Sequence, residues 1–100
     1  MPIVRVRLDP PTGLHKEASP SRNLVWTPPD NLTPSDAVTY KLWITGGASC
    51  ANTCLYHPVA PSWYTMGSEI GAGSYTWQLQ AVSATRHDSP PVNGPPFTMP

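Results

Sequence analysis

Charge is scarce in this 100-residue chain: only 12% of its residues are charged, and its basic and acidic residues cancel to a formal net charge of zero. A nucleic-acid-binding domain needs a basic face to meet phosphates, so this balance argues against that class of partner. No apolar run approaches the roughly 20 residues that cross a bilayer, which argues against membrane insertion. Residues 1–5 lack the long apolar stretch of a signal peptide. Either a signal or a larger parent protein has been removed, or the chain does not use secretion.

Side chains that could form a catalytic site are few and scattered. The three histidines, His15, His57 and His87, lie far apart along the chain. Ser49 follows two glycines, but the Gly-x-Ser-x-Gly pattern of a nucleophile elbow is missing. No nucleophile can be paired with a base, so we expect no enzymatic activity, no catalytic residues, no cofactor and no resident metal.

Proline and aromatic residues are plentiful instead. The 14 prolines make up nearly three times the usual share of about 5%, and they fall between apolar runs, where they end strands and protect sheet edges. Four Trp, four Tyr and one Phe supply core material, since each aromatic side chain buries about 150–250 Å². This content favours one small folded domain over a disordered chain.

Alternation of apolar and polar residues predicts short strands. The strongest signal is 38–45, where Tyr40 and Leu42 share one face and Trp43 lies on the other. Residues 75–84 alternate in the same way, and no useful helical period occurs. The other predicted strands are 14–18, 23–27, 55–59, 63–68 and 97–99, with 3–8 as an extra N-terminal strand. The pattern predicts an all-β fold, a seven-stranded antiparallel β-sandwich.

Four short motifs resemble those of the fibronectin type III family. They are Pro11-Thr12-Gly13-Leu14, Leu24-x-Trp26-x-Pro28-Pro29, Tyr40-x-Leu42 and Gly73-x-Tyr75-x-Trp77-x-Leu79-x-Ala81. In order, they are similar to the family's opening Pro-x-x-Leu and to its second, third and sixth strands. The Gly-Ser-Tyr-Thr-Trp form of the last motif looks like bacterial and phage members.

The resemblance covers about residues 10–99 and has consequences for fold and core. It implies an immunoglobulin-like sandwich over residues 10–100, with residues 1–9 as an N-terminal arm or linker strand. It also implies that Trp26, Tyr40 and Trp77 are core residues. Tyr75 would form a tyrosine corner, with its hydroxyl bonded to nearby backbone.

The two cysteines, Cys50 and Cys54, follow Gly46 in a predicted loop. With His57 they could offer three metal ligands, but the second half of a structural zinc site is missing. A disulfide that fixes the shape of the loop tip is one alternative, and two free thiols are the other. A bond that closes so short a loop would add little entropic stabilisation.

Two tryptophans are predicted to face outward. Trp43 and Trp63 are out of phase with their buried neighbours and belong to different sheets, so they do not form one patch. Trp43, with Tyr56 and His57 from the adjoining strand, would make a surface for a protein or a sugar ring, since exposed Trp is enriched at binding hot spots. The alternative is partial burial under a loop or a neighbouring side chain.

The N-terminal arm is a second candidate for partner binding. Val4, Val6 and Leu8 alternate with two arginines, so they need a surface to bury against. The arm could pair with an edge of its own domain or act as a linker. It could also add a strand to a neighbouring domain or subunit.

These features predict a non-catalytic structural or protein-interaction module, of spacer or adhesion type, in an extracellular or cell-surface assembly. Its partner would be a protein or a neighbouring domain. One alternative is a small phage virion component, a capsid decoration or tail accessory protein on the virion surface, which Met1, the missing signal peptide and the few charges favour. The other is a carbohydrate-binding accessory module of a secreted polysaccharide-degrading enzyme.

Overall fold

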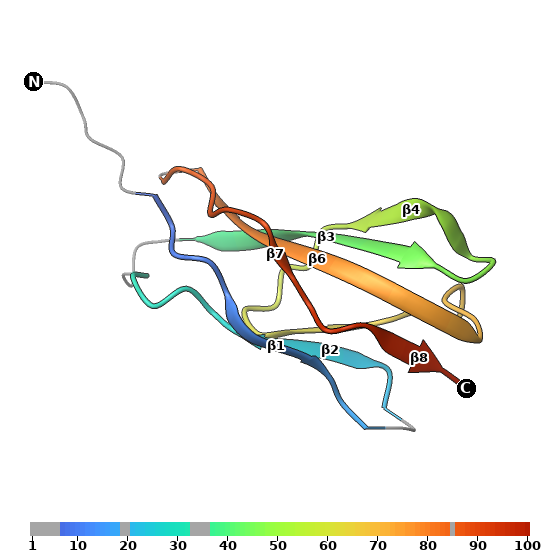
Figure 1. Ribbon diagram of the computed structural model, residues 1–100. Helices are drawn as coiled ribbons and strands as arrows, with labels where there is room; N and C mark the ends of the chain where they lie inside the picture. Colours follow the sequence, from blue (N-terminus) through green and yellow to red (C-terminus); the bar gives the residue numbers. More distant parts are fainter. Residues whose placement is uncertain (1–6, 19–20, 33–36, 85) are drawn as a thin grey trace, which may run out of the picture.

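The computed structural model describes residues 7–18, 21–32, 37–84 and 86–100 and shows an all-β protein (Figure 1). These residues form two antiparallel sheets, of three and five strands, and contain no helix. Within them there is accordingly no helix long and apolar enough to cross a membrane. The all-β, antiparallel part of the sequence prediction is confirmed.

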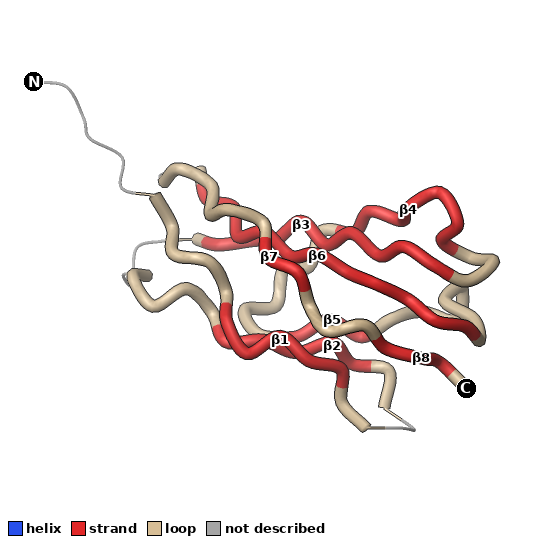
Figure 2. The backbone as a smooth tube through the Cα atoms, viewed as in Figure 1, coloured by secondary structure: helices blue, strands red, loops and turns tan. Residues whose placement is uncertain are grey.

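The smaller sheet has the order β1-β2-β5. It consists of β1 (Thr12–Lys16), β2 (Asn23–Thr27) and β5 (Trp63–Thr65), which lie together in Figure 2. The central strand β2 alternates as predicted, with Leu24 and Trp26 buried. Among the described residues, β1 and β5 each pair with β2 and with no other strand, so they are the two edge strands of this sheet.

The larger sheet has the order β4-β3-β6-β7, and β8 also pairs with β6. Its strands are β3 (Val38–Gly46), β4 (Cys50–Tyr56), β6 (Gly73–Ser83), β7 (Val92–Asn93) and β8 (Phe97–Met99). β7 was not predicted, and the described residues form eight strand segments where seven strands were expected. β7 and β8 pair with separate stretches of β6 because prolines 95 and 96 between them have no N–H to donate to the ladder.

The two sheets bury one face each in a shared core. Trp26 of β2 and Tyr40 of β3 meet edge to face, with ring centroids 5.0 Å apart. Both also donate to the Pro61 carbonyl oxygen, Trp26 from Nε1 at 3.0 Å and Tyr40 from its hydroxyl at 2.7 Å. Alternation along β6 buries Trp77 in the same core. The predicted interior positions of these residues are confirmed.

Tyr75 anchors the start of β6. Its side chain is buried, and its hydroxyl donates to the Gly71 carbonyl oxygen at 2.7 Å. Its ring stacks on Phe97 of β8 with centroids 5.4 Å apart. The expected bond from this hydroxyl to nearby backbone is present.

Arg22 secures the connection between β5 and β6. Its Nη2 donates to the carbonyl oxygens of Gly67 and Ile70, at 2.6 Å each, and its Nε donates to Met66 at 3.2 Å. One guanidinium thus holds three backbone acceptors of the connection between β5 and β6.

The end of the N-terminal arm packs inside the domain. Leu8 is 1% exposed and belongs to the core, and its N–H donates to the His87 carbonyl oxygen at 2.9 Å. This burial favours the in-domain alternative for Leu8, since a partner strand cannot use a side chain that the domain already buries. Val4 and Val6 lie outside the described residues.

Candidate functional site

Four side chains form a straight row across the outer face of the five-stranded sheet. Leu55 of β4 lies opposite Trp43 of β3, Trp43 lies opposite Gln78 of β6, and Gln78 lies opposite Asn93 of β7. We call Leu55, Trp43, Gln78 and Asn93 the Trp43 row. Leu55 is 49% exposed and Trp43 is partly buried, so an apolar end of the row meets solvent. At the other end, Gln78 Nε2 donates to Asn93 Oδ1 at 2.8 Å.

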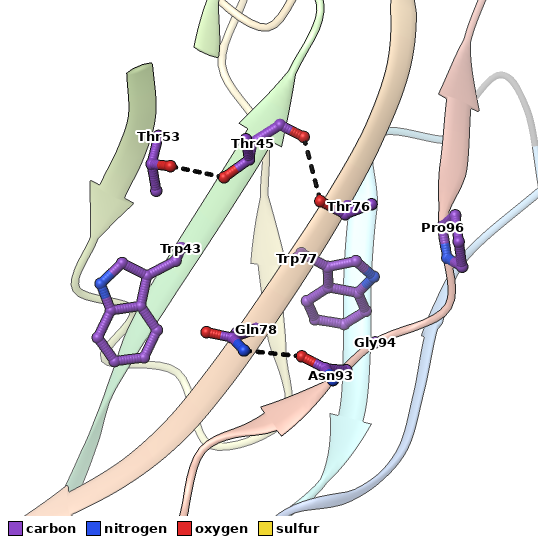
Figure 3. A pocket seen from close by; sticks show the side chains of 9 residues that line it. All are labelled: Trp43, Thr45, Thr53, Thr76, Trp77, Gln78, Asn93, Gly94 and Pro96. Atoms are coloured by element: carbon purple, nitrogen blue, oxygen red, sulfur yellow. Dashed lines mark hydrogen bonds between the residues drawn. The ribbon is translucent and has the colours of Figure 1, made fainter. Parts of the chain in front are cut away.

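A second row of hydroxyl side chains runs beside the first. Thr45 of β3 lies opposite Thr76 of β6, and the Thr45 and Thr53 hydroxyls are 2.7 Å apart. Thr76 Oγ1 also donates to the Thr45 carbonyl oxygen at 3.5 Å. We call Thr53, Thr45 and Thr76 the threonine row. The threonine row and three members of the Trp43 row, Trp43, Gln78 and Asn93, line one groove of about 540 Å³, and Leu55 lies outside it (Figure 3).

A disulfide fixes one wall of this groove. Cys50 and Cys54 are bonded, with their Cα atoms 5.3 Å apart. The sequence pattern predicted a loop here, but both cysteines lie in strand β4. They bracket a bulge, where β4 carries extra residues opposite the segment from Ile44 to Gly46. Thr53 lies inside this bulge with φ 26°, a backbone geometry that non-glycine residues rarely adopt. The bond therefore constrains the segment that presents Thr53.

The opposite wall depends on close contact between Gly94 and Trp77. The Trp77 ring lies beside the 94–96 segment, and its Nε1 donates to the Pro95 carbonyl oxygen at 2.8 Å. A Cβ added at Gly94 would overlap the atoms of the Trp77 indole. Glycine is thus required where the chain crosses the ring between β7 and β8.

The predicted cluster of Trp43, Tyr56 and His57 is divided between the two faces. Tyr56 lies opposite Leu42 in the ladder, so it points to the inner side, where its ring meets Tyr64 at 5.3 Å. Placing Tyr56 beside Trp43 was therefore wrong. His57 is exposed and follows the end of β4. Leu55, which the sequence analysis did not select, is the actual cross-strand neighbour of Trp43.

Tyr56 and Tyr64 form a small cluster with Glu69, away from the groove. The Tyr56 hydroxyl donates to Glu69 Oε1 at 3.3 Å. Burial, followed by the nearby Glu69 carboxylate, raises the pKa of Tyr56 and of Tyr64 above the usual value near 10. Both rings are therefore neutral at physiological pH, which suits a structural contact.

Trp63 lies on the other sheet, as predicted. It is 49% exposed and pairs with Val25 across β5 and β2. It borders a separate hollow that Glu17 and Asn23 also line, so an acidic side chain lies in the same hollow as this indole. The two outward tryptophans therefore have different surroundings, one uncharged and one acidic.

The two cysteines form a disulfide and not a metal site. Both sulfurs are used in the disulfide, so they cannot act as the thiolate ligands that were considered with His57. Among the described residues, no three His, Cys, Asp or Glu side chains gather as a metal site would require.

Comparison with known proteins adds no family or relative. No protein-family model matches the chain, and no curated protein matches it.

Proposed function

We propose that the chain is a fibronectin type III-like β-sandwich that works as a non-catalytic structural and interaction module. The strand orders β1-β2-β5 and β4-β3-β6-β7 support this class, because an immunoglobulin-like sandwich pairs its strands in this way. The Tyr75 hydroxyl bond to the Gly71 backbone supports it further, as a tyrosine corner.

The observation that carries the interaction role is the Trp43 row. An indole and a half-exposed leucine lie directly opposite each other on a sheet face where the neighbouring Thr45, Gln78 and Asn93 are polar. Tryptophan is enriched among the residues that dominate binding energy. Its contribution is largest where neighbouring side chains exclude water from the contact. The row is therefore the contact face of the module.

The disulfide supports a place outside the reducing cytosol. Disulfides persist in secreted, cell-surface and virion proteins and are rare where thiols are kept reduced. We therefore place the module in an extracellular or surface assembly, where it contacts a component of that assembly.

Photocrosslinking in the native assembly tests this function. A benzophenone amino acid replaces Leu55, which leaves Trp43 intact, and a matched variant carries it at Thr27, exposed on the other sheet. The expected result is an adduct with an assembly component from position 55 and none from position 27. Equal adducts from both positions, or none from either, would contradict the assignment of the contact face.

A further inference from the structure

We propose that the groove between the Trp43 row and the threonine row binds a neutral oligosaccharide. This inference rests on the proposed function, and it names the chemistry of the ligand that the contact face takes. The ligand's ring stacks on the Trp43 indole, and its hydroxyl groups bond to the amides of Gln78 and Asn93.

The groove is uncharged. None of its nine lining residues is acidic, basic or histidine; they are Trp43, Thr45, Thr53, Thr76, Trp77, Gln78, Asn93, Gly94 and Pro96. A charged ligand would lose its hydration here without gaining an opposite charge. Its volume of about 540 Å³ falls within the roughly 300–1,000 Å³ of small-ligand sites. These properties select a neutral, polar ligand.

The amide pair leaves one unused NH2 group and one unused oxygen for such a ligand. The bond from Gln78 Nε2 to Asn93 Oδ1 uses one nitrogen and one oxygen. Among the described residues, no hydrogen bond uses Gln78 Oε1 or Asn93 Nδ2. If both amides are flipped, one oxygen and one NH2 group still remain. Neighbouring hydroxyl groups of a sugar both donate and accept, so they match this pair.

The strand order disfavours a peptide in the same place. β3 lies between β4 and β6, and β6 lies between β3 and the β7 and β8 segments. The backbone groups of β3 and β6, beneath the middle of the groove, are therefore already paired with neighbouring strands, and a peptide lying across this face could form no ladder with them. A ligand must bind through side chains and ring stacking, which favours a sugar.

The geometry also sets a minimum length for the ligand. Neighbouring strands lie about 4.8 Å apart, so Trp43 on β3 and Asn93 on β7 are separated by two spacings, roughly 10 Å. Trp43 and Asn93 lie on opposite sides of Gln78 (Figure 3). A molecule that stacks on the indole and reaches Asn93 must therefore be longer than one sugar ring. We therefore expect oligosaccharides to bind and free hexoses to bind poorly.

NMR titration of the isotope-labelled full chain tests the proposal. Cellohexaose, chitohexaose and mannohexaose are the neutral probes, and hexagalacturonate is the charged control. The expected result is a saturable shift of the Trp43 indole N–H and of the Asn93 side-chain amide with at least one neutral probe, without a shift of the Trp63 indole. No shift with any neutral probe, or equal binding of the charged control, would overturn the proposal.

Matched variants locate the site. Trp43→Ala should weaken binding about tenfold or more, equivalent to a loss of roughly 1.4 kcal/mol, and N93A should weaken it without disturbing the fold, because Asn93 is exposed. Trp63→Ala is the control and should change nothing. Equal losses in Trp43→Ala and Trp63→Ala would overturn the site. An adduct with a protein from position 55, combined with no sugar binding, would overturn the saccharide proposal and leave the interaction module in place.

Discussion

Replacing Tyr75 with phenylalanine removes one hydroxyl from the core and keeps the ring. Tyr75 is 1% exposed and donates to the Gly71 carbonyl oxygen at 2.7 Å. Among the described residues that oxygen accepts no other hydrogen bond, so the variant leaves a partly buried acceptor without its partner. An acceptor left in this state costs about 1–3 kcal/mol. We expect the free energy of unfolding to fall by about 2 kcal/mol, the middle of that range.

Tyr40→Phe is the matched control. Tyr40 is equally buried, and its hydroxyl donates to the Pro61 carbonyl oxygen at the same 2.7 Å. Here the acceptor keeps a second donor, because Trp26 Nε1 lies 3.0 Å from it. The loss should therefore be close to the net value of one hydrogen bond, about 1 kcal/mol.

Urea unfolding separates the two variants, provided the dependence of free energy on denaturant is unchanged between them. For a domain of this size, 1 kcal/mol corresponds to a melting shift of about 4–8 °C, which thermal unfolding resolves as a second readout. A larger loss in Tyr40→Phe than in Tyr75→Phe would refute the reasoning, since it would mean that the remaining donor does not protect the carbonyl.

Three further predictions concern Arg22, the disulfide and the ionisation of Tyr40. Arg22→Lys should lower the free energy of unfolding by about 1–3 kcal/mol, because an ammonium cannot replace a guanidinium that holds three carbonyls of the 66–70 segment; unchanged urea unfolding would count against it. In the double variant Cys50→Ala, Cys54→Ala the free energy of unfolding should fall by about 2 kcal/mol, the low end for a disulfide because the closed loop is so short, and melting the native chain with and without reductant checks this independently. Burial raises the pKa of Tyr40 in the folded state, so its neutral form is favoured there. The free energy of unfolding should therefore hold below about pH 10 and fall as the pH rises further. Urea unfolding across alkaline pH measures this fall, and Tyr40→Phe should make it less steep.

Much of the core could be predicted because strand alternation is a local signal. Trp26, Tyr40 and Trp77 are buried as their spacing indicated, and Trp43 faces outward from the same strand that buries Tyr40. Each of these assignments needs only the two-residue period of a strand. Trp63 also lies on a different sheet from Trp43, as predicted.

The cross-strand neighbours could not be predicted, because register is a tertiary property. Tyr56 was placed beside Trp43, but the ladder pairs it with Leu42, and a one-residue difference in register moves a side chain to the other face. The bulge around Thr53 changes the count of residues along β4, and nothing in the local pattern marks it. The groove depends on this register, so Leu55, Gln78 and Asn93 were not selected from the sequence.

Hydrogen exchange of the four indole N–H groups tests the central claim most directly, that alternation places two tryptophans in the core and leaves two outward. Trp26 and Trp77 are buried, with each Nε1 bonded to a carbonyl oxygen, so their indole protons should exchange slowly. Trp43 and Trp63 have no such bond among the described residues, and their indole protons should exchange fast. Slow exchange at Trp43, or fast exchange at Trp26, would contradict both the shared core and the contact face built on it.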